Sequence, residues 1–132
     1  MKIPITINRL EDIYDNYDAF ILDQWGVMHD GKSGYLNAIR CIEKLDSKKK
    51  ILTIISNSSR KKEETILQLP NLGFQSSHFD EVMTSGEMIW SSLKNKNNSE
   101  VKNLGKRCFH IYDQTKNEGE IFQKGLEKYI FV

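Results

Sequence analysis

The sequence predicts an α/β protein built on an open parallel sheet. Short, largely apolar runs at residues 19–22 and 51–55, and a possible third short strand at 81–84, alternate with segments whose apolar residues recur at helical spacing. Strands that alternate with helices in this way are typical of parallel sheets, because a helix carries the chain back to the start of the next strand. The first two runs lead directly into small or polar residues, which makes the strand ends the first place to look for a site.

The N-terminal half is expected to begin with a short amphipathic helix over residues 8–16, since Asn8 and Glu11 resemble a capping pair. The unbroken apolar run 19–22 then predicts a strand buried on both faces of the sheet. Three glycines between 26 and 34 break the chain into turns. The remaining elements of this half are a helix over 35–45, a strand over 51–55 and a helix over 60–69 that Pro70 ends.

The C-terminal half is expected to add a strand over 81–84 and a helix over 85–93. Residues 94–103 form a polar, low-complexity stretch that reads as a solvated loop. The last predicted elements are a strand over 107–111, a helix over 117–126 and a strand over 128–132. A chain that ends within a strand indicates a fold cut before completion, and a terminal edge strand is the alternative.

Length and composition limit the possible functions. With 132 residues the chain is one small domain or part of a larger one. Its 39% hydrophobic and 28% charged residues are typical of a soluble globular protein, and the net charge of +1 provides no global field for nucleic acid or anionic lipid. Cys41 and Cys108 follow no metal or redox spacing, and no apolar run approaches a signal peptide or the ~18 residues of a membrane span. A cytoplasmic protein is expected.

The first two strand ends bring together residues that suit a phosphate. If these strands are neighbours, Asp23 and Ser56 face one crevice, where Trp25, Gly26 and Asn57 in the following turns supply backbone N–H groups. An aspartate in this position can form an acyl-phosphate, a reaction that normally requires Mg²⁺ to neutralise charge. A carboxylate that merely caps a strand-end turn is the alternative interpretation of Asp23.

Three stretches resemble motifs of the haloacid dehalogenase (HAD) superfamily. They are "LDQWGVMHDG", "ILTIISNSSRKKEETILQL" and "GF…EVMTSGEMIW", and they occur in the order of the family's first motif, second motif and cap entry. The resemblance is strongest to class IIA, which has a large α/β cap and includes sugar-phosphate, nucleotide and p-nitrophenyl phosphatases. A poorly characterised subgroup of it with Asp-x-Trp-Gly-Val, Ser-Asn and Thr-Ser-Gly-Glu looks closer still. The resemblance extends over nearly the whole chain from about residue 9, and it implies a Rossmann-like core over 1–86 and the beginning of the cap over 87–132.

The resemblance also implies roles for single residues. Asp23 would be the aspartyl nucleophile and a ligand of Mg²⁺, and Ser56 the phosphate-binding hydroxyl, with the Asn57 amide beside it. Trp25 occupies the position of the family's second aspartate, which transfers protons. Its main-chain carbonyl would still bind the metal, and the amides of Trp25 and Gly26 would contact phosphate.

Two departures from the family pattern affect the expected activity. Tryptophan cannot transfer protons, and removing a general acid/base usually reduces the rate by about 10²–10⁴-fold. Either the substrate has a good leaving group, His29 or Asp30 replaces the aspartate, or catalysis is lost. The third-motif lysine and fourth-motif acidic residues would lie beyond residue 132, so the isolated chain is expected to be inactive.

The sequence therefore predicts a Mg²⁺-dependent phosphatase that acts on a small phosphorylated metabolite through Asp23. The alternative is an inactive HAD-fold binding or scaffolding module, and a phosphoacceptor domain is a weaker third. No nucleic acid or membrane partner is expected, and the oligomeric state, including a homo-oligomer, is left open.

Several other residues could be functional, but their structural interpretations are favoured. His29 is expected to be a solvated loop histidine and Asp30 a turn aspartate. The basic residues 60–62 read as a solvated helix face, and the residues around Trp90 as core packing. Cys108 and His110 would face one side of a strand, but without a second pair of ligands a metal site is disfavoured.

Overall fold

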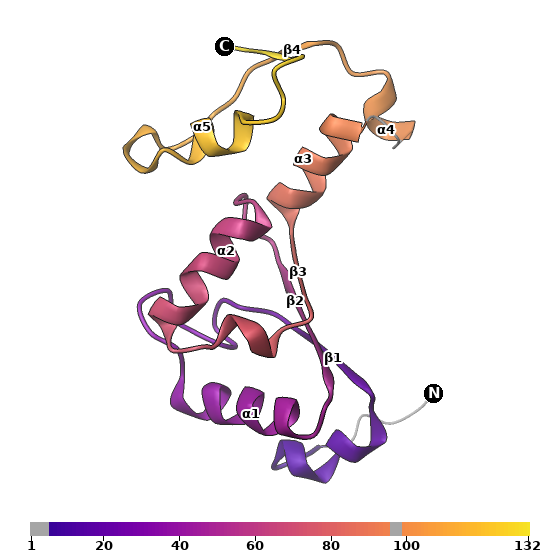
Figure 1. The fold of residues 1–132 in the computed structure, drawn as a ribbon, viewed down its shortest axis with the longest axis vertical. Helices are drawn as coiled ribbons and strands as arrows, with labels where there is room; N and C mark the ends of the chain where they lie inside the picture. The colour runs from indigo at the N-terminus through magenta and orange to yellow at the C-terminus, as the bar shows by residue number, and fades with distance from the viewer. Residues whose placement is uncertain (1–5, 96–98) are drawn as a thin grey trace. The chain divides into compact units, whose positions relative to one another are not determined.

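The computed structural model describes residues 6–95 and 99–132. The chain divides into two compact units, the first within Met1–Ser56 and Ile66–Val82, the second within Asn57–Thr65 and Met83–Val132. Figure 1 shows the order of the elements along the chain. The boundary predicted after residue 86 stays a prediction.

The first unit is built on parallel strands, as the sequence predicted. Strands β1 (Ala19–Leu22), β2 (Ile51–Ser56) and β3 (Glu81–Thr84) form one sheet in the order β1–β2–β3. Strand β1 runs parallel to β2, with Leu22 beside Ile54. Helix α1 (Leu36–Ser47) carries the chain from β1 back to the start of β2, which gives the βαβ unit of a Rossmann-like core (Figure 1).

The core of the first unit lies on one face of this sheet. Leu52 and Ile54 of β2 are fully buried, whereas Ile51 and Ile55, which alternate with them, are about half exposed. Ile21 of β1 is 71% exposed. The prediction that the first strand is buried on both faces is therefore wrong, because the buried residues packed around the sheet cover a single face. These residues are Met28, Ile42, Leu45, Leu52, Ile54, Leu69, Leu72, Phe74 and Val82.

The N-terminal helix predicted over residues 8–16 is also corrected. Two short 3₁₀ helices, Leu10–Asp12 and Tyr14–Asn16, replace it. The backbone N–H of Arg9 donates to the carboxylate of Asp12 at 3.2 Å, so the capping pair is one residue later than the expected one.

The helix between β2 and β3 ends close to residue 69, where the sequence predicted its end. Helix α2 (Lys62–Gln68) passes directly into the 3₁₀ turn Leu69–Leu72, which contains Pro70. Gly73 follows with φ 89°, a left-handed conformation that glycine adopts without strain. A further 3₁₀ turn, Ser76–His78, precedes β3.

The second unit contains helices and two short strands. Its elements are α3 (Ser85–Asn95), α4 (Ser99–Lys102), β4 (Arg107–Cys108), the 3₁₀ turn Gln114–Lys116, α5 (Glu118–Gln123) and β5 (Ile130–Phe131). Strands β4 and β5 are parallel. The core is small: Leu93, Leu126 and Tyr129 are buried, and the Tyr129 hydroxyl donates to the Leu93 carbonyl at 2.8 Å.

Three predictions for the second unit are partly wrong. The strands expected over 107–111 and 128–132 are two residues long each, because β4 and β5 pair only with each other among the described residues. The stretch 94–103 contains helix α4, while residues 96–98 lie outside the described residues. No helix in the described ranges has the length and apolar character needed to cross a membrane.

Candidate active site

The structure places Asp23 and Ser56 at the same edge of the first unit's sheet. Asp23 directly follows β1, and Ser56 is the last residue of β2. Because the two strands are parallel and Leu22 lies beside Ile54, both residues lie at the carboxyl ends of adjacent strands. The Asp23 side chain is exposed and Ser56 is buried. This edge is where ligands bind in open parallel sheets.

A tight turn follows Asp23. The Gln24 carbonyl accepts the backbone N–H groups of Val27 at 3.2 Å, Met28 at 2.8 Å and His29 at 3.3 Å. The N–H of Gly26 donates to the His29 carbonyl at 2.9 Å. Phosphate binding by the Gly26 amide would therefore require this hydrogen bond to be shared or released.

The Trp25 side chain packs on its own loop. A Cβ placed on Gly31 would lie 2.1 Å from the Cη2 atom of Trp25, so only glycine leaves room for the indole there. Gly31 has φ 89°, which also favours glycine. The indole meets the His29 ring edge to face at 5.3 Å between centroids and remains 60% exposed. The Trp25 side chain thus packs within the loop that follows Asp23.

His29 is buried, which corrects the prediction of a solvated loop histidine. Its side chain is 4% exposed, and its Nδ1 accepts the Gly31 backbone N–H at 3.0 Å. Burial lowers the pKa of His29, and the nearby carboxylates of Asp30 and Asp23 oppose this change only in part. An imidazole that accepts at Nδ1 is neutral and holds its proton on Nε2. His29 therefore fixes the loop conformation.

Asp30 is a turn aspartate, as the structural interpretation predicted. Its Oδ1 accepts the backbone N–H groups of Lys32 at 2.9 Å and Ser33 at 2.8 Å. These hydrogen bonds lower the pKa of Asp30, since they favour the charged carboxylate. A carboxylate held in this form is a poor proton donor. Because His29 is likewise held by a hydrogen bond within the loop, neither residue is arranged to replace the aspartate that the family resemblance implies at position 25.

The turn after β2 is held against helix α3. The Ser58 carbonyl accepts the Gly86 N–H at 3.0 Å, and the Ser58 hydroxyl accepts the Arg60 N–H at 3.2 Å. A Cβ on Gly86 would lie 2.0 Å from the Ser59 carbonyl oxygen, which is backbone and has little freedom to move. Gly86 is therefore required for the close approach of α3 to this turn.

Thr84 and Glu87, the first and last residues of the Thr-Ser-Gly-Glu motif, make hydrogen bonds that hold helices α3 and α2 in place. The Thr84 hydroxyl accepts the Glu87 N–H at 3.0 Å and so caps helix α3, while it donates to the Arg60 carbonyl at 2.5 Å. The Glu87 carboxylate accepts the Lys62 N–H at the start of α2 at 3.3 Å. The Thr-x-x-Glu spacing is itself a capping signature, and it was a signal for this role in the sequence.

The second unit has an open cavity of about 420 Å³ that the sequence did not predict. Asn57, which was expected to bind phosphate, is one of its lining residues. The His110 ring lies 4.9 Å from the Tyr112 ring and 5.2 Å from the Phe122 ring, between centroids. The full lining, hereafter the second-unit cavity, is Asn57, Ser59, Ser85, Gly86, Ile89, His110, Ile111, Tyr112, Asp113, Glu118 and Phe122. The only sequence signal for it was the run His-Ile-Tyr-Asp at 110–113.

The basic residues near the second strand end do not form a simple solvated face. The Arg60 guanidinium donates from Nε and Nη2 to Glu118 Oε1, each at 3.0 Å. The Lys61 ammonium lies 3.7 Å from the centroid of the Trp90 ring, within the range of a cation–π interaction. Trp90 packs against the buried cluster of the second unit, as predicted, and its indole N–H donates to the Lys124 carbonyl at 3.0 Å. Its neighbours Met88 and Ile89 are about half exposed, so the prediction of core packing is wrong for them.

The expected metal ligands supply only part of a magnesium shell. The Asp23 carboxylate and the Trp25 carbonyl are oxygen ligands of the kind Mg²⁺ prefers. Elsewhere in the described residues, no three His, Cys, Asp or Glu side chains gather as a metal site. Cys108 and His110 do not lie on one strand, because β4 ends at Cys108. The donors near Asp23 fit Mg²⁺ provided that substrate oxygens and water complete the shell.

Comparison with known proteins defines the class of this chain. Residues 20–122 match the model of the haloacid dehalogenase-like hydrolase family. The chain therefore belongs to this family of hydrolases. Comparison with curated proteins finds no match.

Two solved structures are similar to the chain. One is a hydrolase of the haloacid dehalogenase-like family from Brucella suis 1330, with a TM-score of 0.75 and 28% identity over 97% of this chain. The other is a hypothetical protein from Pyrococcus horikoshii OT3, with a TM-score of 0.56 and 22% identity over 85% of this chain, which shows the fold alone. The chain spans 44% and 40% of the lengths of these two proteins.

Proposed function

We propose that this chain carries the nucleophile of a Mg²⁺-dependent phosphatase of class IIA that acts on a small phosphorylated metabolite. One observation carries the proposal: in a member of the haloacid dehalogenase-like hydrolases, an exposed aspartate, Asp23, follows β1 at the sheet edge where Ser56 ends β2. A carboxylate at the carboxyl end of a parallel strand can reach a ligand in the crevice there.

The proposed reaction proceeds in two steps. An oxygen of the Asp23 carboxylate attacks phosphorus, the bond from phosphorus to the ester oxygen breaks, and an aspartyl-phosphate and an alcohol form. Water then attacks the phosphorus of the intermediate, the bond from phosphorus to the Asp23 oxygen breaks, and inorganic phosphate leaves, which regenerates the carboxylate. The Ser56 hydroxyl and the Asn57 amide would hold the phosphoryl oxygens. Bound Mg²⁺, held by Asp23 and the Trp25 carbonyl, would neutralise the charge of the phosphoryl group.

The loop geometry limits the substrates that this site would cleave well. Trp25 has no group that acts as an acid or base near neutral pH, while His29 and Asp30 are held within the loop by hydrogen bonds. Protonation of the leaving oxygen would then depend on water or on a leaving group that needs no proton. Aryl phosphates should therefore be cleaved faster than alkyl phosphates. Because the chain spans less than half of the similar structures, we also propose that it is the core and the beginning of the class IIA cap, with little turnover alone.

Trapping of beryllium fluoride tests the nucleophile without requiring turnover. Beryllium fluoride binds an aspartate as a phosphate mimic, so Mg²⁺-dependent ¹⁹F signals and shifts of the Asp23 and Ser56 amides are expected. Asp23→Asn should abolish them. Asp15→Asn, which changes an exposed aspartate of the turn Tyr14–Asn16, is the matched control and should leave them intact. Trapping that survives in Asp23→Asn would exclude the assignment.

The second candidate function is a binding or scaffolding module without catalysis. The packing of Trp25 on Gly31 and His29 favours it, because the position of the family's proton-transferring aspartate here has a structural role. Absence of beryllium fluoride trapping in a longer polypeptide that includes the family's third and fourth motifs, together with an unchanged fold, would support this candidate over the phosphatase.

A further inference from the structure

We propose that the first unit has an anion site in addition to its strand ends, and that this site binds a small phosphate ester. The site is an open cleft of about 390 Å³ between helix α1 and the 3₁₀ segment that precedes β1, and it is hereafter called the α1 cleft. Its lining residues fall within 8–14 and 37–44, all of them in the first unit. The inference goes beyond the proposed function and does not depend on it.

One wall of the α1 cleft is the exposed face of α1. Relative to Asn37, the residues Arg40, Cys41 and Lys44 follow three, four and seven positions later, so the four side chains lie on one face of the helix. All four residues are exposed and line the cleft. The buried residues of α1 belong to the core of the first unit, which fixes the orientation of the helix.

The other wall is the 3₁₀ segment before β1. Leu10 and Tyr14 pack against the core of the first unit, and this anchors the backbone that carries Arg9 and Glu11. Figure 1 shows the segment in indigo beside α1, and the two together line the cleft. Both walls are therefore held by buried contacts, while the charged groups between them are exposed.

Positive charge exceeds negative charge in the α1 cleft. Three lining residues are cationic, Arg9, Arg40 and Lys44, whereas Glu11 is acidic. Arg9 is shared with the carboxylate of Asp12 at 3.8 Å, an exposed pair that solvent weakens. Arg40 and Lys44 form no ion pair with any described residue. Two cations on one helix face are therefore available to an anion.

These donors favour one phosphate group over two separate carboxylates. The Arg40 guanidinium presents a planar fork that matches two oxygens of one group, and the Lys44 ammonium adds a point charge one helical turn away. Side chains at this spacing are about 5–6 Å apart at Cβ, so a single dianionic group can contact both. The side chains of Leu10 and Tyr14 line the same cleft and provide apolar surface for the organic part of an ester.

Glu11 and Cys41 make the charge inside the cleft measurable. Burial raises the pKa of Cys41, and the Glu11 carboxylate raises it further. A bound phosphate would act on the thiol in the same sense as Glu11, because it adds negative charge to the same cleft. Since the thiolate is the reactive form, a phosphate ester in the cleft should slow the alkylation of Cys41.

Alkylation by iodoacetamide, followed by peptide mass spectrometry, tests the proposal on the unmodified chain. In Mg²⁺-free buffer, saturating glycerol 3-phosphate should slow the alkylation of Cys41 on the order of tenfold. Cys108, in the second unit, is the internal control and should react at an unchanged rate. Glycerol, which has no charge, should not protect Cys41, and succinate should bind more weakly than glycerol 3-phosphate. Titrations followed by ¹H–¹⁵N NMR should shift the amides of Arg40 and Lys44 and provide the dissociation constants.

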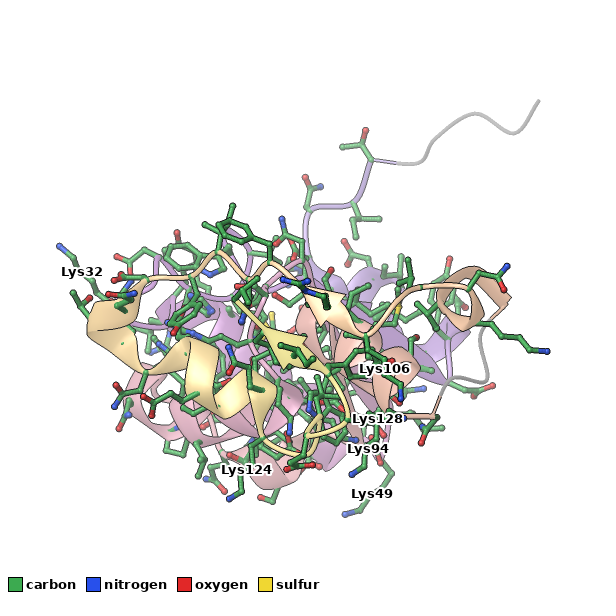
Figure 2. All side chains as sticks on the ribbon, turned by 90° about the horizontal axis from the view of Figure 1, so that it is seen from above. Lys32, Lys49, Lys94, Lys106, Lys124 and Lys128 are labelled. Carbon is green, nitrogen blue, oxygen red and sulfur yellow. The ribbon has the colours of Figure 1, made fainter. Side chains whose placement is uncertain are left out.

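Variants test the sign of each charge. Arg40→Gln should weaken the binding of glycerol 3-phosphate on the order of tenfold and Lys44→Gln on the order of fivefold, whereas Glu11→Gln should strengthen it on the order of threefold. Lys49→Gln is the matched control. Lys49 is exposed just beyond the end of α1, where Figure 2 labels it, and it does not line the cleft, so its replacement should leave binding unchanged.

The outcomes are independent of those that test the proposed function. The α1 cleft would be excluded as a phosphate site by unprotected Cys41, by binding of succinate as tight as that of glycerol 3-phosphate, or by equal effects of Arg40→Gln and Lys49→Gln. Protection that Arg40→Gln weakens and Glu11→Gln strengthens would support the site. Trapping of beryllium fluoride reports on Asp23 and requires Mg²⁺, so either proposal can fail while the other stands.

Discussion

Replacement of Thr84 by valine should destabilise the second unit strongly, although the two side chains have the same shape. Thr84 is 1% exposed, its hydroxyl caps α3 through the Glu87 N–H, and it donates to the Arg60 carbonyl. Loss of a helix cap costs about 1 kcal/mol, and a buried polar group that loses its partner costs about 1–3 kcal/mol. Thr84→Val should therefore lower the free energy of unfolding by about 2–4 kcal/mol.

Thr84→Ser is the matched variant, because it keeps the hydroxyl and removes only a methyl group, which should cost about 1 kcal/mol. Urea titrations would follow the indole N–H resonance of Trp90, whose donation to the Lys124 carbonyl is specific to the folded second unit. Trp25 provides a second indole signal in the first unit. If Thr84→Val were no more destabilising than Thr84→Ser, the hydroxyl would not connect α3 to the turn after β2 as described.

Three further predictions concern the loop, the core and an exposed carboxylate. Gly31→Ala should displace the Trp25 indole and destabilise the loop by more than about 1 kcal/mol, because the new methyl group would collide with the indole and because residue 31 has a left-handed φ. A change in Trp25 fluorescence would report the displacement, and a lower urea midpoint would report the loss of stability. Ile54→Ala should lower the free energy of unfolding by about 2–5 kcal/mol in the same titration, because Ile54 is fully buried in the first unit. The pKa of Asp113 should be about 2, and Thr115→Ala should return it toward 3.8, which carboxyl-detected NMR would follow. Because the pKa of Asp113 is lower in the folded than in the unfolded protein, its contribution to the stability of the fold is present above pH 3.8 and is lost as the pH falls toward 2.

The strand ends of the first unit were predictable from local pattern. The run 19–22 is unbroken and apolar, the run 51–55 is apolar except for Thr53, and each stops at a polar residue, so the position of both strands could be assigned. Their adjacency follows from the short helical connection between them. For these reasons the positions of Asp23 and Ser56 at one sheet edge agree with the sequence-based expectation.

The loop after Asp23 could not be predicted in the same way. Whether His29 is buried depends on how Trp25 folds back onto Gly31, which is a contact between residues two to six positions apart with no periodic signal. The expectation of a solvated histidine followed only from the position of His29 in a loop.

The second-unit cavity was missed for a related reason. Glu118 lies 58 positions from Arg60, and no spacing rule in the sequence pairs them. The short strands β4 and β5 were overestimated because apolar residues in 107–111 and 128–132 resemble strand interiors, although only two residues of each run are assigned to a strand. Sequence pattern thus located elements, whereas contacts between distant residues determined the cavity.

The uncovered side of the β1–β2 sheet affects how this polypeptide behaves at high concentration. Branched aliphatic groups of Ile21, Ile51 and Ile55 meet water there, so hydrophobic dyes should bind and colloidal attraction between molecules should rise with ionic strength. Ile21→Lys would place an ammonium group on this side, raising solubility without removing a buried contact. Crystallisation trials and spectroscopy on the protein would benefit from that substitution.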